Sequence, residues 1–178
     1  MVPGREKNLG KAGGMTEYQR LFLVQARAVY SVFELLRRNP SLHPCHALHY
    51  LQMATELLGK AHAWKHGPTS KTHRAFVGFL RSLSTNRQAQ KQLGFEGQNE
   101  SWVYLIRKSI RLAASVEDLA PTLAGDGPNP EYPWPPDDPK TAPAEYAFPI
   151  WQELRGTAEG RQFLKLIGDL FSAAEAFL

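Results

Sequence analysis

The segment "HYLQMATELLGKAHAWKHG", residues 49–67, has the most regular pattern in the chain. Apolar residues recur every three or four positions on both sides of a narrow polar stripe, which is typical of a helix packed on two sides. The stripe contains Gln52, Glu56 and Lys60, each about one helical turn from the next. Glu56 precedes Lys60 in the order that favours an ion pair, and Gln52 can donate to Glu56. We therefore expect either a buried polar seam that fixes helix register or one solvated edge.

The sequence before this segment predicts a helical hairpin. A first helix begins at Thr16, which has capping-box spacing to Gln19, and runs to about Arg38, before Pro40. Pro44 suits the first turn of the second helix, which ends near Gly67. The apolar face of the first helix is unusually wide. It indicates either a central helix or one that also meets another subunit.

Further helical patterns follow along the chain. They are a helix from near Thr72, a short capped helix within 84–95, a long helix from about Asn99 to Gly125, and a helix from about Ala158 to Phe177. The long helix has a potential break or new cap at Ser115. Strand patterns of any length, internal repeats and Gly-rich phosphate loops are absent from the sequence. We predict an all-α fold, an antiparallel bundle of four to five principal helices with an extended Pro-rich arm before the C-terminal helix.

Four regions are expected from changes in composition. They are a disordered Gly- and Lys-rich leader (1–15), the helical bundle (16–125), an extended arm rich in proline and aromatic residues (126–148), and a C-terminal helix packed on the bundle (149–178). Tyr132, Trp134 and Trp151 belong to a run of large aromatics that is atypical of a solvated linker. Either they anchor the arm in grooves of its own bundle, or they form a docking segment for a protein partner.

Charge is divided unevenly along the chain. Residues 1–111 contain 17 basic and six acidic side chains, whereas residues 112–178 contain four basic and 11 acidic ones. Five candidates for an anion or RNA patch fall on the polar sides of two helices expected to be neighbours: Arg74, Arg81, Arg107, Lys108 and Arg111. Either these cations bind phosphates without reading the base sequence, or the acidic region neutralises them within the chain.

Two consecutive stretches, "ALHYLQMATELLGKAHAWKHG" (47–67) and "TSKTHRAFVGFLRSL" (69–83), resemble the middle of HEPN domains. The shared features are Gln and Glu four residues apart, a following Lys-Ala pair, a turn ended by Gly, and a Thr-His start to the next helix. The resemblance covers roughly residues 16–115. It implies a small helical bundle of the kind associated with prokaryotic nucleotidyltransferases, toxin–antitoxin pairs and phage defence.

Nuclease members of this family carry an Arg and a His four to six residues apart, and two subunits bring their copies together to cleave RNA. Here "RNPSLH" supplies Arg38, Asn39 and His43. In that role Arg38 would hold a phosphate, Asn39 would orient it and His43 would transfer a proton. In the family, however, this motif follows the region that "ALHYLQMATELL" resembles, whereas here it precedes it. The alternative is Arg38 at a helix C-terminus and His43 in a surface turn.

The histidines lie between positions 43 and 73, which raises the question of a metal. Cys45 and His49 have i, i+4 spacing, as do His62 and His66, with His73 nearby in sequence. The two groups are about 20 Å apart along one helix and cannot share an ion. Neither group has a carboxylate or second cysteine to complete a tetrahedral site. We therefore expect no metal site and no cofactor.

A single cysteine, Cys45, excludes an internal disulfide, and no apolar run approaches the length of a membrane span. These features favour a cytoplasmic protein. We interpret the chain as a non-catalytic interaction or regulatory module with a protein partner, either as a homodimer or beside a nucleotidyltransferase-type protein. The alternatives are a metal-independent ribonuclease that uses Arg38 and His43 across a dimer, and non-specific RNA binding through the basic helices.

Overall fold

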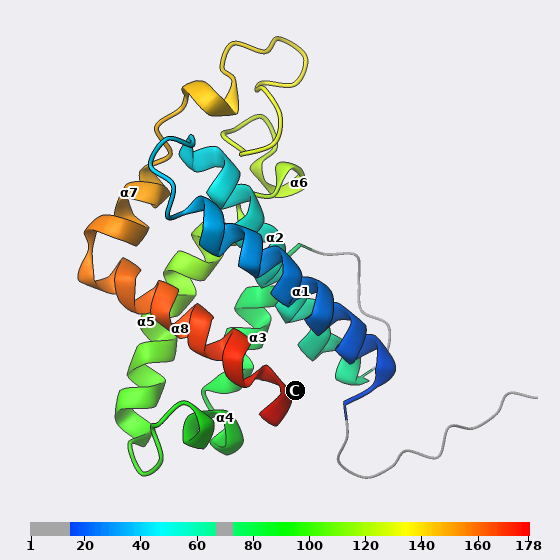
Figure 1. Cartoon of the computed structure of the whole chain (residues 1–178), viewed down its shortest axis with the longest axis vertical. Coiled ribbons are helices and arrows are strands. Elements are labelled where there is room, and N and C mark those ends of the chain that lie inside the picture. Colours follow the sequence, from blue (N-terminus) through cyan, green and yellow to red (C-terminus); the bar gives the residue numbers. More distant parts are fainter. Residues whose placement is uncertain (1–14, 67–72) are drawn as a thin grey trace, which may run out of the picture.

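The computed structural model describes residues 15–66 and 73–178, and its elements are helical (Figure 1). The principal helices are α1 (Glu17–Leu36), α2 (Pro44–Ala63), α3 (Ala75–Leu83), α5 (Asn99–Glu117) and α8 (Ala158–Ala173). The shorter elements are α4 (Arg87–Gln92), α6 (Pro121–Ala124), α7 (Pro149–Gly156) and the 3₁₀ turns η1 (Trp64–His66), η2 (Pro143–Glu145) and η3 (Ala174–Ala176). The predicted all-α bundle is confirmed. Within the two described ranges, no helix combines the length and the apolar character needed to cross a bilayer.

The predicted helical hairpin is present, and its second helix lies at the centre of the bundle. α2 packs against α1 on one side and against α3 on the other (Figure 1). Gly59 permits the second contact, because a Cβ added there would lie 2.5 Å from the carbonyl carbon of Ala75. Residues 1–14 of the predicted leader and the helix stop at Gly67 lie outside the described residues, whereas Met15 packs against the core.

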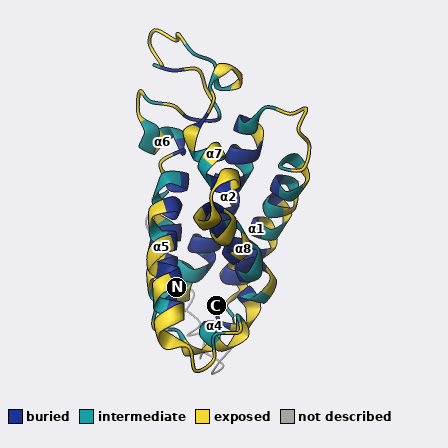
Figure 2. Ribbon diagram, turned by 90° about the vertical axis from the view of Figure 1, so that its left-hand side faces the viewer, coloured by how far each residue is buried: buried dark blue, intermediate teal, exposed yellow. Residues whose placement is uncertain are grey.

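α1 is a surface helix with a buried side and an exposed apolar side. Thr16 and Gln19 form the predicted capping box, with Gln19 N donating to Thr16 Oγ1 at 3.2 Å and Thr16 N donating to Gln19 Oε1 at 3.0 Å. The buried side includes Val29 and Phe33. The opposite side leaves Tyr18 57% exposed, so the expectation of a central helix is wrong for α1. Figure 2 shows this division between buried and exposed faces.

The long helix α5 ends at Glu117, and α6 begins at Pro121. No break occurs at Ser115, whose hydroxyl donates to the carbonyl oxygen of Arg111 at 3.2 Å within the same helix. α5 instead ends four residues before Pro121, because Pro121 has no N–H to donate to the carbonyl of Glu117. Pro121 then starts the new turn of α6. Trp102 is fully buried and donates from Nε1 to Leu83 O at 2.8 Å, which joins α5 to the end of α3.

The C-terminal region contains two helices, α7 and α8, where the sequence pattern predicted one from about Ala158. Thr157 separates them and caps α8, since its Oγ1 accepts the N–H of Gly160 at 2.9 Å. A side chain at position 160 would overlap the backbone of α7, so glycine permits this tight corner. α8 then crosses the bundle and buries Phe163 and Leu170 against it (Figure 1).

The Pro-rich arm folds on its own chain. Trp134 and Thr141 form an isolated antiparallel bridge, and the ring of Trp134 meets Tyr146 and Phe148 edge to face at centroid distances of 5.4 and 6.2 Å. Trp134 and Phe148 are buried. The arm stands at the end of the molecule beyond α6 and α7 (Figure 1). Trp134, Tyr146 and Phe148 therefore stabilise the fold of the arm by packing on one another.

Candidate functional site

The polar stripe of α2 forms a buried hydrogen-bond network. Glu56 is only 8% exposed, and its carboxylate accepts a hydrogen bond from Gln52 Nε2 at 2.8 Å and pairs with Lys60 Nζ. His73, just before α3, lies with Nδ1 2.7 Å from Glu56 Oε2. Burial alone would raise the pKa of Glu56, but these three partners outweigh it and hold the pKa below its ordinary value. The network joins α2 to the start of α3 and is structural in geometry.

The three residues of the nuclease-like motif are close in sequence but engage separate local partners. Arg38 is largely exposed and pairs with Glu34 at 2.9 Å, one turn earlier on α1. Asn39 Oδ1 accepts the N–H of Ser41 at 3.0 Å and shapes the turn. His43 is the N-cap of α2, and its Nδ1 accepts the N–H of Cys45 at 3.3 Å. These contacts match the structural alternative, with a cation near a helix C-terminus and a turn histidine.

The candidate basic patch is partly neutralised by acidic residues. Lys108 pairs with Glu159 at 2.8 Å, and Arg111 pairs with Glu153 and lies 3.6 Å from Glu159. Arg74, which precedes α3, pairs with Asp118 at 3.1 Å. Arg81 and Arg107 are exposed. Acidic residues of α7 and α8 thus lie against the basic side of α5, as the intramolecular interpretation of the charge division predicts.

The histidine-rich region contains no assembled metal site among residues 15–66 and 73–178. Cys45 is buried, and His49 lies with Nδ1 3.1 Å from Glu131 of the arm. His62 packs on the ring of Phe79 at 5.1 Å. Cys45, His49 and His62 therefore contact different parts of the protein, and the side chain of His66 lies outside the described structure.

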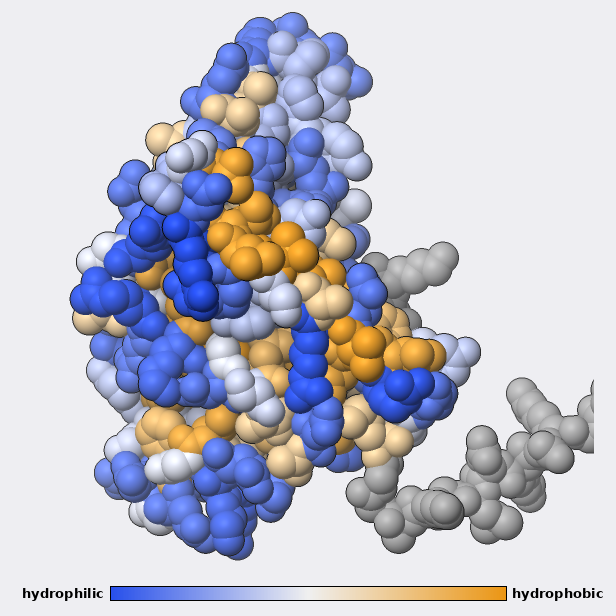
Figure 3. All heavy atoms as spheres, viewed as in Figure 1, coloured by the Kyte–Doolittle hydropathy of each residue, from blue (hydrophilic) through white to orange (hydrophobic). Residues whose placement is uncertain are grey.

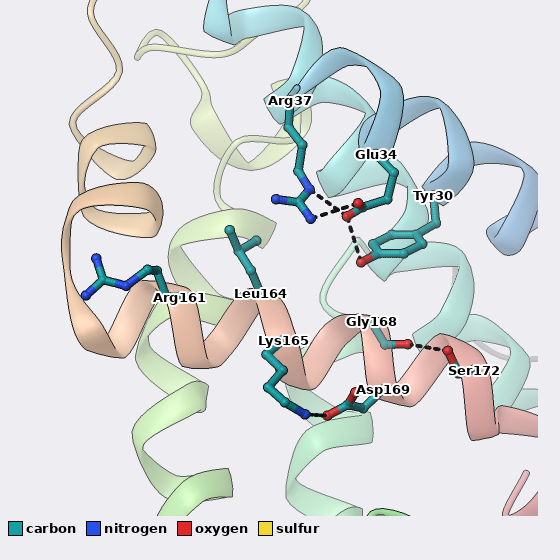
Figure 4. A pocket seen from close by; sticks show the side chains of 9 residues that line it. All are labelled: Tyr30, Glu34, Arg37, Arg161, Leu164, Lys165, Gly168, Asp169 and Ser172. Atoms are coloured by element: carbon teal, nitrogen blue, oxygen red, sulfur yellow. Dashed lines mark hydrogen bonds and ion pairs between the residues drawn. The ribbon is translucent and has the colours of Figure 1, made fainter. Parts of the chain in front are cut away.

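A polar depression of about 570 Å³ lies between α1 and α8 (Figure 4). Glu34 pairs with Arg37 at 2.6 Å and accepts the hydroxyl of Tyr30 at 3.0 Å. Burial and the nearby Glu34 carboxylate raise the pKa of Tyr30 well above its ordinary value. Across the depression Lys165 pairs with Asp169 at 2.5 Å. Glu34 and Asp169 thus neutralise Arg37 and Lys165, whereas the fifth charged residue of the lining, Arg161, donates to the carbonyl oxygens of Arg155 and Gly156 at 3.3 and 3.2 Å.

The remaining candidate is an apolar surface on α1, which we call the outward face of α1. It exposes Tyr18, Leu21, Val24 and Leu35 by 57%, 49%, 55% and 71%. Figure 3 shows hydrophobic residues gathered along this helix on the side that faces the viewer. Exposed apolar patches that are continuous on a folded surface usually mark binding sites.

An apolar groove of about 310 Å³ lies at the N-terminal end of this face. It is lined by Tyr18, Leu21, Phe22, Gln25, Leu57 and Trp64. Tyr18 stacks on Trp64 with ring centroids 4.3 Å apart, so the wall of the groove is held in place by η1. Sequence patterns did not indicate the contribution of Leu57 and Trp64, because it depends on how α2 crosses α1. The wide apolar face of α1 in the sequence did indicate that the groove residues on this helix could form a contact surface.

The aromatic residues proposed as partner contacts differ in accessibility. Trp134 is buried in the arm, whereas Tyr132 is 60% exposed. Trp151 on α7 is half-buried, and the Arg155 guanidinium lies 5.3 Å from its ring centroid. They do not form a single exposed cluster comparable to the outward face of α1.

Comparison with family models, with curated proteins and with solved structures finds no match to this chain.

Proposed function

We propose that the protein is a helical interaction module and that a protein partner docks on the outward face of α1. The observation that carries this proposal is the exposure of several large apolar side chains along one face of a well-packed helix, next to an apolar groove. Removing apolar surface from water contributes about 25 cal/mol per Å² to the free energy of binding. A partner that covers this face would therefore gain binding free energy from burying its side chains. We also propose that the bundle is of the HEPN kind, and the Gln52–Glu56–Lys60 network in the second helix supports this.

Site-specific photo-crosslinking in cells tests this function with a matched control. A photoreactive phenylalanine analogue replaces Tyr18 on the outward face of α1, or Tyr104 on α5. The two tyrosines are 57% and 58% exposed, so accessibility does not distinguish them. We expect a discrete protein adduct from position 18 and none from position 104. Equal adducts from both positions, or none from position 18, would contradict the proposal.

A further inference from the structure

We propose that the outward face of α1 binds the same face of a second copy of the chain, with the two helices antiparallel. This inference rests on the proposed function and identifies its partner. A seam with heptad spacing runs along this face, with positions three and four residues apart, at Tyr18, Leu21, Gln25, Ala28, Val32 and Leu35, and Val24 lies beside it. All of them except Val32, which is half-buried, are exposed. The seam is about 25 Å long, enough for a continuous helix–helix contact.

The two ends of the seam have complementary shapes. Leu35 is the most exposed of the large apolar side chains on α1 and projects at the C-terminal end. The groove beside Tyr18 and Trp64 lies at the N-terminal end of the same face. In an antiparallel pair, Leu35 of each copy faces the groove of the other. This reciprocity is what a two-fold symmetric interface requires, and it closes the assembly at two copies.

Seating Leu35 opposite Tyr18 fixes the remaining register. Leu21 then lies opposite Val32, and Gln25 lies opposite Ala28, so every seam position faces another seam position. The small side chain of Ala28 allows the helices to approach closely at the centre. A single polar seam residue, here Gln25, is a known means of specifying register.

The same register brings opposite charges together at both ends of the seam. Glu17, which pairs with Arg20, directly precedes the seam, and Arg38, which pairs with Glu34, follows it; their side chains are 67% and 71% exposed. In the antiparallel pair the two residues differ by only about 3 Å in height along the helix axis. A parallel pair would instead place Glu17 beside Glu17 and Arg38 beside Arg38. Charge complementarity therefore favours the antiparallel arrangement.

This dimer differs from one that would assemble a two-subunit nuclease. Its register places the two copies of Arg38 about 35 Å apart along the paired helices. The two copies of His43, each five residues after Arg38 in its own chain, therefore also lie at opposite ends of the dimer. The interface therefore holds two chains together without joining their Arg38–His43 motifs.

The oligomeric state of the full chain tests the interface. At about 100 μM, light scattering coupled to size exclusion should give twice the 20.0 kDa chain mass. Leu35→Glu should raise the dimer dissociation constant at least about 100-fold, because it places a charge in an apolar groove. The control, Tyr104→Glu, adds the same charge at an exposed position on α5 and should leave the dimer intact. Circular dichroism verifies that both variants are folded.

Disulfide trapping tests the orientation. In a Cys45→Ala background, chains with Tyr18→Cys mixed with chains with Leu35→Cys should form a covalent heterodimer on mild oxidation. Leu35→Cys alone should form none, because the two copies of position 35 lie at opposite ends. Efficient linkage of Leu35→Cys to itself would overturn the antiparallel register.

The possible failures are distinguishable. A wild-type chain that stays monomeric, or a dimer that tolerates Leu35→Glu, overturns self-association. If a monomeric chain still crosslinks through position 18 to a different protein, the proposed function stands and only the identity of the partner is wrong. If neither result is obtained, both proposals fail.

Discussion

Glu56 shows how a charged residue is accommodated at the centre of a helical bundle. Its side chain is 11% exposed, and its two oxygens are engaged by Gln52, Lys60 and His73. A buried carboxylate with several partners is stable as long as each partner remains, and removing one leaves the others unsatisfied. The network therefore links α2 to the residue that precedes α3.

Glu56→Gln should lower the free energy of unfolding by about 2 kcal/mol, because Lys60 and His73 lose a charged acceptor. Asp169→Asn is the matched control, since Asp169 also pairs with a lysine four residues away but the lysine side chain is 75% exposed. That change should cost less than about 0.5 kcal/mol. Urea denaturation of the two variants and the wild type measures the difference. Equal losses would show that the α2 network behaves as a surface pair.

The depressed pKa of Glu56 predicts a pH dependence of stability with a defined sign. Because the unfolded chain binds a proton at this carboxyl more readily than the folded chain, the stabilisation is present at neutral pH. It is lost as pH falls below about 4.3, the ordinary value for glutamate, and through the folded pKa. The difference in unfolding free energy between wild type and Glu56→Gln should therefore shrink on acidification. A difference that stays constant down to acidic pH would contradict this.

The contacts within α2 could be predicted from sequence, whereas the partner of Glu56 outside the helix could not. Spacing of four residues is enough to place Gln52, Glu56 and Lys60 on one line. The position of His73 depends on how α3 docks on α2, which no local pattern specifies. The same limit applies to Trp64 in the α1 groove.

The start of α3 shows how one helix can cap another. Arg74 provides no side-chain cap there, and Glu117 at the end of α5 does so instead. Its Oε1 accepts the N–H groups of Phe76 and Val77 at 2.7 and 2.9 Å. Burial raises the pKa of Glu117, outweighing those two hydrogen bonds. Its other oxygen, Oε2, has no hydrogen-bond partner among the described residues.

Glu117→Ala and Glu117→Gln should have different effects. Alanine removes the acceptor of two buried amides and should lower stability by about 2–3 kcal/mol. Glutamine keeps an acceptor oxygen without a charge and should leave stability at neutral pH unchanged or raise it by up to about 1 kcal/mol. In the wild type, stability contributed by this group should fall as pH rises through its raised pKa, the opposite sign to Glu56. Thermal unfolding between mildly acidic and neutral pH measures both effects, and equal losses in the two variants would exclude a capping role.

Two glycines within helices predict opposite outcomes for the same substitution. Gly59→Ala should destabilise the protein by about 3 kcal/mol or more, because its Cβ would meet the backbone of Ala75. Gly78→Ala should stabilise α3 by about 0.5–1 kcal/mol, since nothing lies within 4 Å of its added Cβ. Chemical denaturation compares the two variants. A stabilising Gly59→Ala would contradict the close approach of α2 and α3.

Helix existence was predicted well from sequence, and helix ends less well. Caps and stops with local chemistry, such as Thr16 and Pro40, gave correct limits for α1. The C-terminal region was read as one helix because the pattern before Thr157 is short and contains few apolar positions. The long helix was predicted to run to about Gly125 with a potential break at Ser115, whereas α5 ends at Glu117, because Pro121 has no N–H to donate to the carbonyl of the residue four positions earlier.

At the scale of the whole molecule, the acidic C-terminal region lies on the basic middle region. Glu153 and Glu159, from α7 and α8, neutralise Lys108 and Arg111 on α5. Both the charge division and the alternative of intramolecular neutralisation could be predicted from sequence. The identity of the pairs could not, because it depends on the tight corner between α7 and α8.

Removing that neutralisation should create affinity for nucleic acid. The double variant Glu153→Gln/Glu159→Gln should bind double-stranded RNA more tightly than wild type, with a logarithmic salt slope steeper by about two, one for each freed cation. The control Asp126→Asn/Asp137→Asn removes the same charge from exposed positions of the arm. Filter binding across a salt series measures the affinity and the salt slope of each double variant. Identical slopes in the two would show that Lys108 and Arg111 do not form a phosphate-binding surface.

The four tryptophans occupy environments different enough to serve as separate optical reporters. Trp102 is fully buried where α5 meets the end of α3. Its fluorescence should have a short emission wavelength until the hydrophobic core unfolds. Trp64 borders the apolar groove of α1, so its emission and its access to a soluble quencher should respond to whatever occupies that groove. A chain that retains only Trp64 would thus monitor binding in real time, and one that retains only Trp102 would monitor global unfolding.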